Sequence, residues 1–417
     1  MSFFRSLSIY TITSIINAGV PFLLLPVLTY YLTTEEYGLL AIIQIFIIFI
    51  IPLISINIQS TIQLEYHDLS KEEFALWVSS VLLIPLVTVF IICLLFILLE
   101  SMINSFININ IYWILSIPLI AFVQVVPQTI LAIYKISERV MNYAKYQLAL
   151  TLLNLLLTLF FVILLQLTWE GRLFAIFFTY LIFSFLGIYL LIRMNLLVFR
   201  INKEYILQAL KIGLPLILHV VSAVLFMMSD RLFISYYLGN EAVGIYSVGA
   251  QIAMIAMIIQ QSFNQAWVPF LFKNLKIASI ESKIKIIKVS YMAIIFFILL
   301  PFMIELINPL LFYFFINDKF IDSMQYVFWI ALGYSLLGIY KVVTNYIFYK
   351  KRVKILSFMT FFSLIFNLIL NYVLIHKYGS IGVAYGTAIT IAIFFILAFL
   401  IANRIYPMPW LFFLKGK

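Results

Sequence analysis

Two adjacent residues, Asp230 and Arg231, carry the only formal charges between Lys211 and Glu241. Asp230 lies eight residues before Leu238, a separation of ~12 Å along a helix. Inside a hydrocarbon core ~30 Å thick, a charge at the centre of a span costs ~2.5–3.5 kcal/mol and is retained where it faces other helices or a water-filled cavity. The pair therefore predicts either a buried structural ion pair with another helix or a site for a charged cargo or a coupling ion.

Other polar residues recur at helical spacing near this pair. His219 lies eleven residues before Asp230, close to three turns, so the two share one face. We interpret His219 either as a histidine hydrogen-bonded between helices or as an ion-coupling group that titrates near neutral pH. Gln251, Gln261 and Gln265 fall within ~80° of helical arc. They predict either a wall that contacts a polar substrate such as a sugar or hydrogen bonds that hold helices together.

The composition excludes a soluble globular protein. Of the 417 residues, 65% are hydrophobic and 10% are charged, and the mean hydropathy is +1.15, whereas soluble domains are about 45–50% apolar. The chain therefore has the composition of an integral membrane protein, with little sequence left for a catalytic domain. Its single cysteine, Cys93, and three widely separated histidines predict neither a disulfide nor a metal site. We expect no enzymatic activity and no cofactor.

Twelve apolar segments are long enough to cross a bilayer, which predicts an all-α membrane fold. They lie at residues 8–31, 38–58, 75–99, 112–133, 147–167, 173–192, 212–237, 242–270, 290–316, 325–348, 355–375 and 381–403. Of the 26 Lys and Arg residues, 21 fall in the termini and in every second connection, and three, Arg172, Lys319 and Lys377, fall in the alternate connections. Because Lys and Arg are retained on the cytoplasmic side, both termini are expected in the cytoplasm. The net charge of +10 then faces anionic membrane lipids, and a nucleic-acid partner is not expected.

The two halves of the chain resemble each other. Thr29–Leu40 aligns with Ser235–Tyr246 at an offset of 206 residues, and Asn154–Thr158 aligns with Asn367–Asn371 at an offset of 213. We interpret the asparagines of the second pair as packing residues. Because each half has six spans, both enter the membrane from the same side, and the repeat is parallel. The predicted parts are a six-helix lobe at 1–192, a cytoplasmic linker at 193–211, a second six-helix lobe at 212–403 and a cytoplasmic tail at 404–417.

Three blocks of sequence carry a family resemblance. They are Leu32–Gly38, the Asp230-Arg231 pair with the following Leu238–Ser247, and Asn367–Ala384. In these blocks the chain resembles polysaccharide or O-antigen repeat-unit flippases of the Wzx type, within the multidrug/oligosaccharidyl-lipid/polysaccharide exporter superfamily.

The resemblance implies two six-helix lobes around a central cavity. It also implies that alternating access transfers an undecaprenyl-diphosphate-linked oligosaccharide from the inner to the outer leaflet of the bacterial cytoplasmic membrane, for surface polysaccharide biosynthesis. The implied partners are the lipid-linked glycan, membrane lipids and a polysaccharide polymerase machinery.

Basic recognition is expected in the second half of the chain. Such flippases often carry an arginine and a glycine where this chain has Tyr30 and Thr33, and the two intramembrane bases, Arg231 and Lys341, both belong to the second half. A diphosphate requires such charge, and an arginine can hold two of its oxygens. Glu305 lies at a depth comparable to that of Lys341, ~18 and ~24 Å on straight helices. The two predict either a salt bridge or a relay for a coupling ion, H+ or Na+.

Three functions are compatible with these features. A lipid-linked oligosaccharide flippase fits best. A cation-coupled multidrug exporter of the same superfamily should have acidic and aromatic residues in its cavity rather than an arginine and a lysine. A membrane glycosyltransferase or polymerase should show a sizeable loop or an acidic motif, and the longest outer connection, Glu100–Ile111, contains a single acid.

Overall fold

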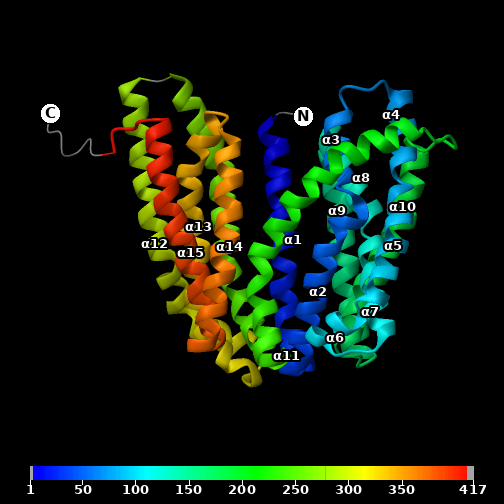
Figure 1. Cartoon of the computed structure of the whole chain (residues 1–417), viewed down its shortest axis with the longest axis horizontal. Helices are drawn as coiled ribbons and strands as arrows, with labels where there is room; N and C mark the ends of the chain where they lie inside the picture. Colours follow the sequence, from blue (N-terminus) through cyan, green and yellow to red (C-terminus); the bar gives the residue numbers. More distant parts are fainter. Residues whose placement is uncertain (1–2, 278, 411–417) are drawn as a thin grey trace. The chain divides into compact units, whose positions relative to one another are not determined.

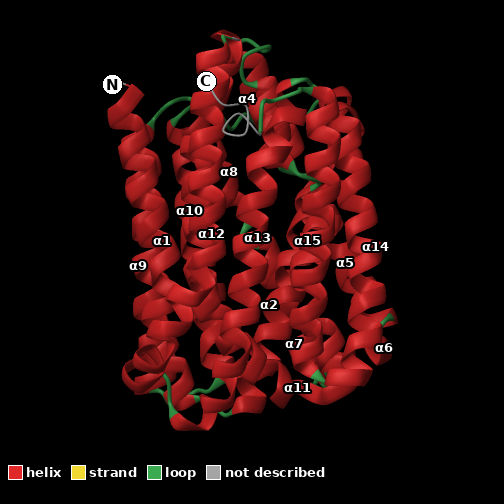
Figure 2. Ribbon diagram, turned by 90° about the vertical axis from the view of Figure 1, so that its left-hand side faces the viewer, coloured by secondary structure: helices red, strands yellow, loops and turns green. Residues whose placement is uncertain are grey.

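The computed structural model describes residues 3–277 and 279–410, and within these ranges every regular element is a helix (Figure 2). Eleven of these helices are long and apolar enough to cross a membrane. The longest, α11 (Lys203–Ile277), has 75 residues and departs from helical geometry at Gly239, where φ is 83° and ψ is 175°. Glycine adopts this positive φ without steric cost. Because α11 contains two of the twelve predicted spans, the predicted all-α membrane fold is confirmed.

The other long helices overlap the remaining predicted spans. Before α11 they are α1 (Phe3–Tyr31), α2 (Thr34–Ser55), α3 (Ile58–Glu65), α4 (Lys71–Val81), α5 (Ile84–Leu98), α6 (Glu100–Ile107), α7 (Ile111–Phe122), α8 (Val125–Ile136), α9 (Val140–Leu159), the π-helix η1 (Phe160–Leu164) and α10 (Trp169–Arg193). After α11 they are α12 (Ile280–Phe315), the short 3-10 helix η2 (Asp318–Ser323), α13 (Met324–Tyr349), α14 (Val353–Tyr378) and α15 (Ser380–Ile405). The pairs α4–α5 and α7–α8 each make one span, and the short helices α3 and α6 were not predicted.

The chain forms two compact units. Unit 1 comprises Met1–Met228 and Gly239–Gly244, and unit 2 comprises Ser229–Leu238 and Ile245–Lys417. Both units therefore take part of α11. The lobe and linker boundaries drawn from the sequence remain a prediction, although α11 begins at Lys203, so part of the stretch 193–211 is helical.

Unit 1 has an aromatic core that ties its helices together. α1 packs along α9, α2 along α7, and α10 against both α8 and α9. Trp77 is fully buried on α4 and stacks on Phe74 with ring centroids 6.2 Å apart. Tyr146 on α9 donates a hydrogen bond of 2.8 Å to the carbonyl of Phe183 on α10. The ring of Tyr146 also lies edge-on to that of Phe183, with centroids 5.0 Å apart, and because buried aromatic side chains contribute large apolar areas, this contact holds α9 against α10.

Two glycines of unit 1, Gly38 on α2 and Gly244 on α11, bring two backbones into direct contact. A Cβ atom on Gly38 would lie 1.7 Å from the carbonyl oxygen of Asn240, and a Cβ atom on Gly244 would lie 1.9 Å from the carbonyl oxygen of Thr34. The hydroxyl of Thr34 also donates to Glu241 Oε1 at 3.4 Å. Small residues allow helix backbones to approach this closely in membranes, and here only hydrogen fits at both positions.

The π-helix η1 positions the start of α10. The N–H of Leu165 donates to the carbonyl of Phe160 at 3.1 Å, and the N–H of Leu167 donates to that of Phe161 at 3.0 Å. A Cβ atom on Gly171 would lie 3.2 Å from the carbonyl carbon of Phe161, so the first turn of α10 packs closely on η1. π-Helical turns are rare and often occur at functional sites. Here the turn brings the first residues of α10 beside α9.

Unit 2 is built around α13 and α15 (Figure 1). α15 packs against both α13 and α14, and α12 packs against α13. Trp267 on α11 is buried and donates its ring N–H to the carbonyl of Val342 on α13 at 3.3 Å. The ring of Phe263 lies edge-on to that of Phe297 on α12, with centroids 5.3 Å apart. These contacts fix the part of α11 in unit 2 against α12 and α13.

Candidate functional site

Asp230 is buried in unit 2, where side chains from three helices hold its carboxylate. It accepts hydrogen bonds from the hydroxyl of Tyr246 at 2.7 Å, the amide of Asn371 at 3.0 Å and the hydroxyl of Thr387 at 3.0 and 3.1 Å. Tyr246 lies beyond the break in α11, Asn371 on α14 and Thr387 on α15. The Asp230 side chain is only 7% exposed, and a buried charge needs such partners because an unpaired one is costly.

Two asparagines add further oxygen atoms around Asp230. Asn367 and Asn371, one turn apart on α14 and fully buried, share a face. Asn367 Oδ1 accepts from Asn371 Nδ2 at 3.2 Å and from the hydroxyl of Ser229 at 3.1 Å, and Asn367 Nδ2 donates to Thr387 Oγ1 at 3.1 Å. Asn371 Oδ1 is buried without a hydrogen-bond partner among the described residues. We call Asp230, Asn367, Asn371 and Thr387 the Asp230 cluster.

The Asp230 cluster has the chemistry of a site for a hard cation. Carboxylate, amide and hydroxyl oxygens are the ligands that such cations prefer, and a carboxylate can also take up a proton. Asn367 and Asn371, interpreted from the sequence as packing residues, also take part in this hydrogen-bond network. Asn371 reaches Asp230, and Asn367 reaches Ser229 and Thr387, because α14 and α15 pack together beside this part of α11.

Arg231 points away from its neighbour, Asp230. Its Nε donates to the hydroxyl of Ser247 at 3.1 Å, and its Cζ lies 5.9 Å from the ring centroid of Tyr246. Within the described ranges no ion pair joins Arg231 to Asp230, since neighbouring helical side chains point ~100° apart. Its Nη1 and Nη2 make no hydrogen bond to the part of the chain that is described. Tyr246 contacts both Asp230 and Arg231, but it was not predicted as a site residue. Its position in the Leu238–Ser247 block was the only indication of this role in the sequence.

The other predicted substrate-binding residues of unit 2 lie on α11 and α13. Gln251 is half-buried, whereas Gln261 and Gln265 are exposed. Lys341 is half-buried on α13, and its amino group forms no ion pair with any described residue. A half-buried cation on α13 therefore remains available to an anion.

The remaining ion-coupling candidates do not join the Asp230 cluster. Glu305 is exposed on α12 and accepts a hydrogen bond of 3.2 Å from Asn308, one turn away. In the described part of the chain Glu305 and Lys341 form no salt bridge, so of the two alternatives the ion relay stays a prediction. A comparable depth did not place the two side chains on facing sides of their helices. The side chain of His219 lies outside the described residues.

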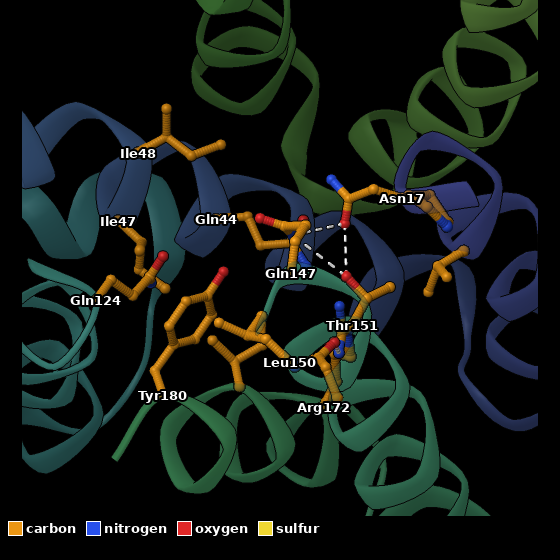
Figure 3. A pocket seen from close by; sticks show the side chains of 14 residues that line it. Asn17, Gln44, Ile47, Ile48, Gln124, Gln147, Leu150, Thr151, Arg172 and Tyr180 are labelled. Carbon is orange, nitrogen blue, oxygen red and sulfur yellow. Dashed lines mark hydrogen bonds between the residues drawn. The ribbon is translucent and has the colours of Figure 1, made fainter. Parts of the chain in front are cut away.

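Unit 1 contains a polar cavity of about 300 Å³. Figure 3 shows Asn17, Thr151 and Arg172 on one side of it and Gln124 and Tyr180 on the other. The side chains that line it are Asn17, Val20, Pro21, Gln44, Ile47, Ile48, Gln124, Gln147, Leu150, Thr151, Asn154, Arg172, Ile176 and Tyr180. Asn17 Oδ1 accepts from Thr151 Oγ1 at 2.7 Å and from Gln147 Nε2 at 3.0 Å. Of these fourteen described residues, none is acidic.

Arg172 is the charged residue of this cavity. Its Nη1 donates to Asn154 Oδ1 and to Thr158 Oγ1, both at 2.7 Å. Arg172 was predicted to lie in an outer connection, but the structure places it in a helix. α10 begins at Trp169, so Arg172 lies in its first turn and within a candidate span. The predicted span began one residue too late, at 173, and a charge at a span end is easily counted with the loop.

The fold is that of two-lobe, twelve-helix membrane transporters. An inward-facing multidrug resistance MATE family transporter of the MOP superfamily matches with a TM-score of 0.73 and 16% identity, over 93% of this chain and 94% of that one. The lipid II flippase MurJ, in an inward closed conformation, matches with a TM-score of 0.73 and 17% identity, over 95% of this chain and 87% of that one. The class defined by this likeness is a multi-pass membrane protein with a transporter fold.

The family follows from the sequence comparison. A family model described as polysaccharide biosynthesis protein matches residues 3–275, more than half of the chain, and the protein belongs to this family. A protein of the Lsg locus of Haemophilus influenzae is 25% identical over 375 residues, which cover 86% of this chain and 87% of that protein. An uncharacterized membrane protein of the same organism is 29% identical over 376 residues, which cover 87% and 88%. The resemblance derived from the sequence blocks is confirmed.

Proposed function

We propose that the protein flips undecaprenyl-diphosphate-linked oligosaccharide repeat units from the inner to the outer leaflet of the bacterial cytoplasmic membrane. It works by alternating access, has both termini in the cytoplasm and delivers its product to a polysaccharide polymerase. Membership of the polysaccharide biosynthesis protein family supports a glycan substrate. The fold shared with a lipid II flippase supports transfer across a bilayer.

The cavity of unit 1 is the observation that carries this proposal. Its lining offers amide and hydroxyl groups, among them Asn17, Gln44, Gln147 and Thr151, which can hydrogen-bond the hydroxyl groups of a sugar. A multidrug exporter that selects cations would need acidic residues, but a cation in this cavity would meet Arg172 and no acid among the described lining residues. Repulsion of this kind excludes a ligand as effectively as attraction selects one. The flippase is therefore favoured over the exporter.

Arg231 is the proposed ligand of the diphosphate. Ser247 fixes its Nε at 3.1 Å, which leaves Nη1 and Nη2 for two phosphate oxygens. An arginine binds phosphate through such a planar fork, whereas a lysine supplies a point charge. Lys341, half-buried on α13, is the other cation of unit 2 and the next candidate for this role.

The Asp230 cluster is the proposed site of the coupling ion. Its carboxylate accepts hydrogen bonds from two hydroxyl groups and one amide N–H group, and the amide oxygen of Asn371, Oδ1, is buried without a hydrogen-bond partner in the described structure. A cation, H+ or Na+, that binds here would neutralise Asp230. A ligand shifts a conformational equilibrium only by its differential affinity for the two states, so this ion would drive transport if it binds one state more tightly.

The proposal is tested with Arg231 variants in cells that depend on this protein for surface glycan. A charge-assisted hydrogen bond is worth ~1.5–3 kcal/mol, so we expect Arg231→Gln to slow export by about tenfold or more. Arg231→Lys should retain partial export. Lipid-linked oligosaccharide should accumulate in the inner leaflet of Arg231→Gln cells, and extraction and quantification of this lipid is the measurement.

Arg404→Gln is the matched control, because Arg404 is exposed and its loss changes the net charge equally. Protein levels must be equal in all strains, since loss of a structural contact would lower them. Export at the parental rate by well-expressed Arg231→Gln would contradict the phosphate role. Normal export in cells that lack the protein would refute the flippase function itself.

A further inference from the structure

Arg172 is held in the unit 1 cavity in a way that leaves half of its guanidinium group unused. Asn154 and Thr158 both bind Nη1 at 2.7 Å. Nε and Nη2 make no hydrogen bond to the described residues. These two nitrogens form the edge of the guanidinium that presents two parallel N–H donors, the arrangement that binds both oxygens of a carboxylate or a phosphate. The side chain is thus fixed from one side and open on the other.

The charge of Arg172 has no counter-ion in the cavity. None of the fourteen described lining residues is acidic, and the residues that bind Arg172 are a neutral amide and a neutral hydroxyl. A charge removed from water without a partner is unfavourable. An anionic ligand would supply the missing partner and would complete the site.

The rest of the lining suits a single sugar ring. Asn17, which lines the cavity, accepts two hydrogen bonds through Oδ1, while its Nδ2 donates to no described residue and can donate to a ligand. Ile176 and Tyr180 supply apolar surface on the same cavity. A volume of about 300 Å³ lies at the lower end of small-molecule sites, ~300–1,000 Å³, and accommodates one sugar unit rather than an oligosaccharide.

We infer that the unit 1 cavity binds one carboxylate-bearing sugar of the transported glycan, with the carboxylate on Nε and Nη2 of Arg172. This rests on the proposed function and narrows its substrate to acidic glycans. A neutral sugar would leave Arg172 without a counter-ion. The diphosphate of the lipid carrier is the other source of a paired oxyanion, so the experiment includes it as a separate probe.

The purified full-length protein in detergent is titrated with sodium glucuronate, glucose or sodium pyrophosphate at constant sodium concentration and ionic strength, and thermal unfolding is recorded. A ligand that binds the folded state raises the midpoint with concentration. We expect glucuronate to raise it and glucose at the same concentration to leave it unchanged. Arg172→Gln should weaken glucuronate binding about 10- to 100-fold, and the exposed-site variant Arg404→Gln should bind as the parental protein does.

Equal effects of glucuronate and glucose, or undiminished glucuronate binding by Arg172→Gln, would overturn the inference. A shift that depends on Arg172 with pyrophosphate but not with glucuronate would assign the cavity to the lipid diphosphate and would equally overturn it. If Arg172→Gln does not fold, Arg172→Lys replaces it in the titration, because lysine retains the charge without the planar fork. Glucuronate affinity equal to that of the parental protein in Arg172→Lys would exclude the bidentate contact. Glycan export in cells lacking the protein tests the flippase function separately, because the titration needs no transport.

Discussion

Asp230 and the oxygen atoms around it predict that a cation binds in unit 2. Asp230→Asn keeps the shape of the side chain and removes its charge. Replacing N-methyl-D-glucamine with Na+ at constant ionic strength should raise the thermal midpoint of the parental protein and not that of Asp230→Asn. A cation at ten times its Kd stabilises the folded state by ~1.4 kcal/mol. Thermal unfolding of the purified protein measures the difference.

Asp322→Asn serves as the control, because Asp322 is exposed in the same unit and the change in charge is identical. This variant should respond to Na+ as the parental protein does. If Na+ has no effect but acidification stabilises the parental protein more than Asp230→Asn, the coupling ion is H+. Insensitivity to both ions would exclude Asp230 from coupling.

Glu65 on α3, outside the candidate spans, predicts a pH-dependent stability. Burial, with the nearby charge of Asp68, raises the pKa of its carboxyl group, and the hydrogen bond of 2.8 Å from Gln208 lowers it in part. The pKa of Glu65 is therefore higher in the folded state than in the unfolded state. Protonated Glu65 contributes its full share to stability below the unfolded pKa, and this contribution is lost as pH rises through the folded pKa. Glu65→Gln keeps an acceptor for Gln208, so it should unfold at a higher temperature than the parental protein at pH 8, with a smaller difference at pH 4.

Glu72→Gln, an exposed change on α4, is the control and should show no such dependence on pH. A lower thermal midpoint for Glu65→Gln than for the parental protein at pH 8 would contradict the raised pKa of Glu65.

At the scale of elements, the close crossing of α2 and α11 predicts a strict requirement for glycine. Gly38→Ala would place a Cβ atom 1.7 Å from the carbonyl oxygen of Asn240, so the backbones must separate. Overpacking of this kind typically costs ~1–3 kcal/mol, and we expect a lower thermal midpoint or a loss of folded protein. Gly19→Ala on α1 is the control, because nothing lies within 4 Å of a Cβ atom there and alanine favours a helix by up to ~1 kcal/mol. Equal stability of the two variants would show that α2 and α11 separate at no cost.

The helices were predictable from the sequence because hydropathy along the chain is a local property. The same reasoning singled out Asp230 and Arg231, since a charge in an apolar span is visible without a structure. Their partners were not predictable. Asn371 and Thr387 lie 141 and 157 residues from Asp230, and no pattern within a helix reveals which face of a distant helix it meets. Arg172 was missed for a different reason: span boundaries are uncertain by a few residues, and this arginine stands at one.

At the scale of the whole molecule, the charge asymmetry predicts which connections face the cytoplasm. With Cys93→Ala as background, Lys319→Cys in η2 and Lys288→Cys near the start of α12 both introduce a thiol at an exposed position. A membrane-impermeant maleimide added to intact cells should label Lys319→Cys and leave Lys288→Cys unlabelled. Permeabilised cells should show labelling of both, which controls for accessibility. The opposite pattern in intact cells would invert the topology.

The contact between Gly38 and Gly244 also bears on the origin of the chain. Thr34 and Gly38, advanced by the repeat offset of 206 residues, correspond to Asn240 and Gly244. Gly38 meets Asn240, while Gly244 meets Thr34, so each copy of the motif touches the other in the same way. This reciprocity is the mark of an isologous interface between identical subunits. Such reciprocity is expected of a six-span unit that paired with a copy of itself before duplication and fusion joined the two.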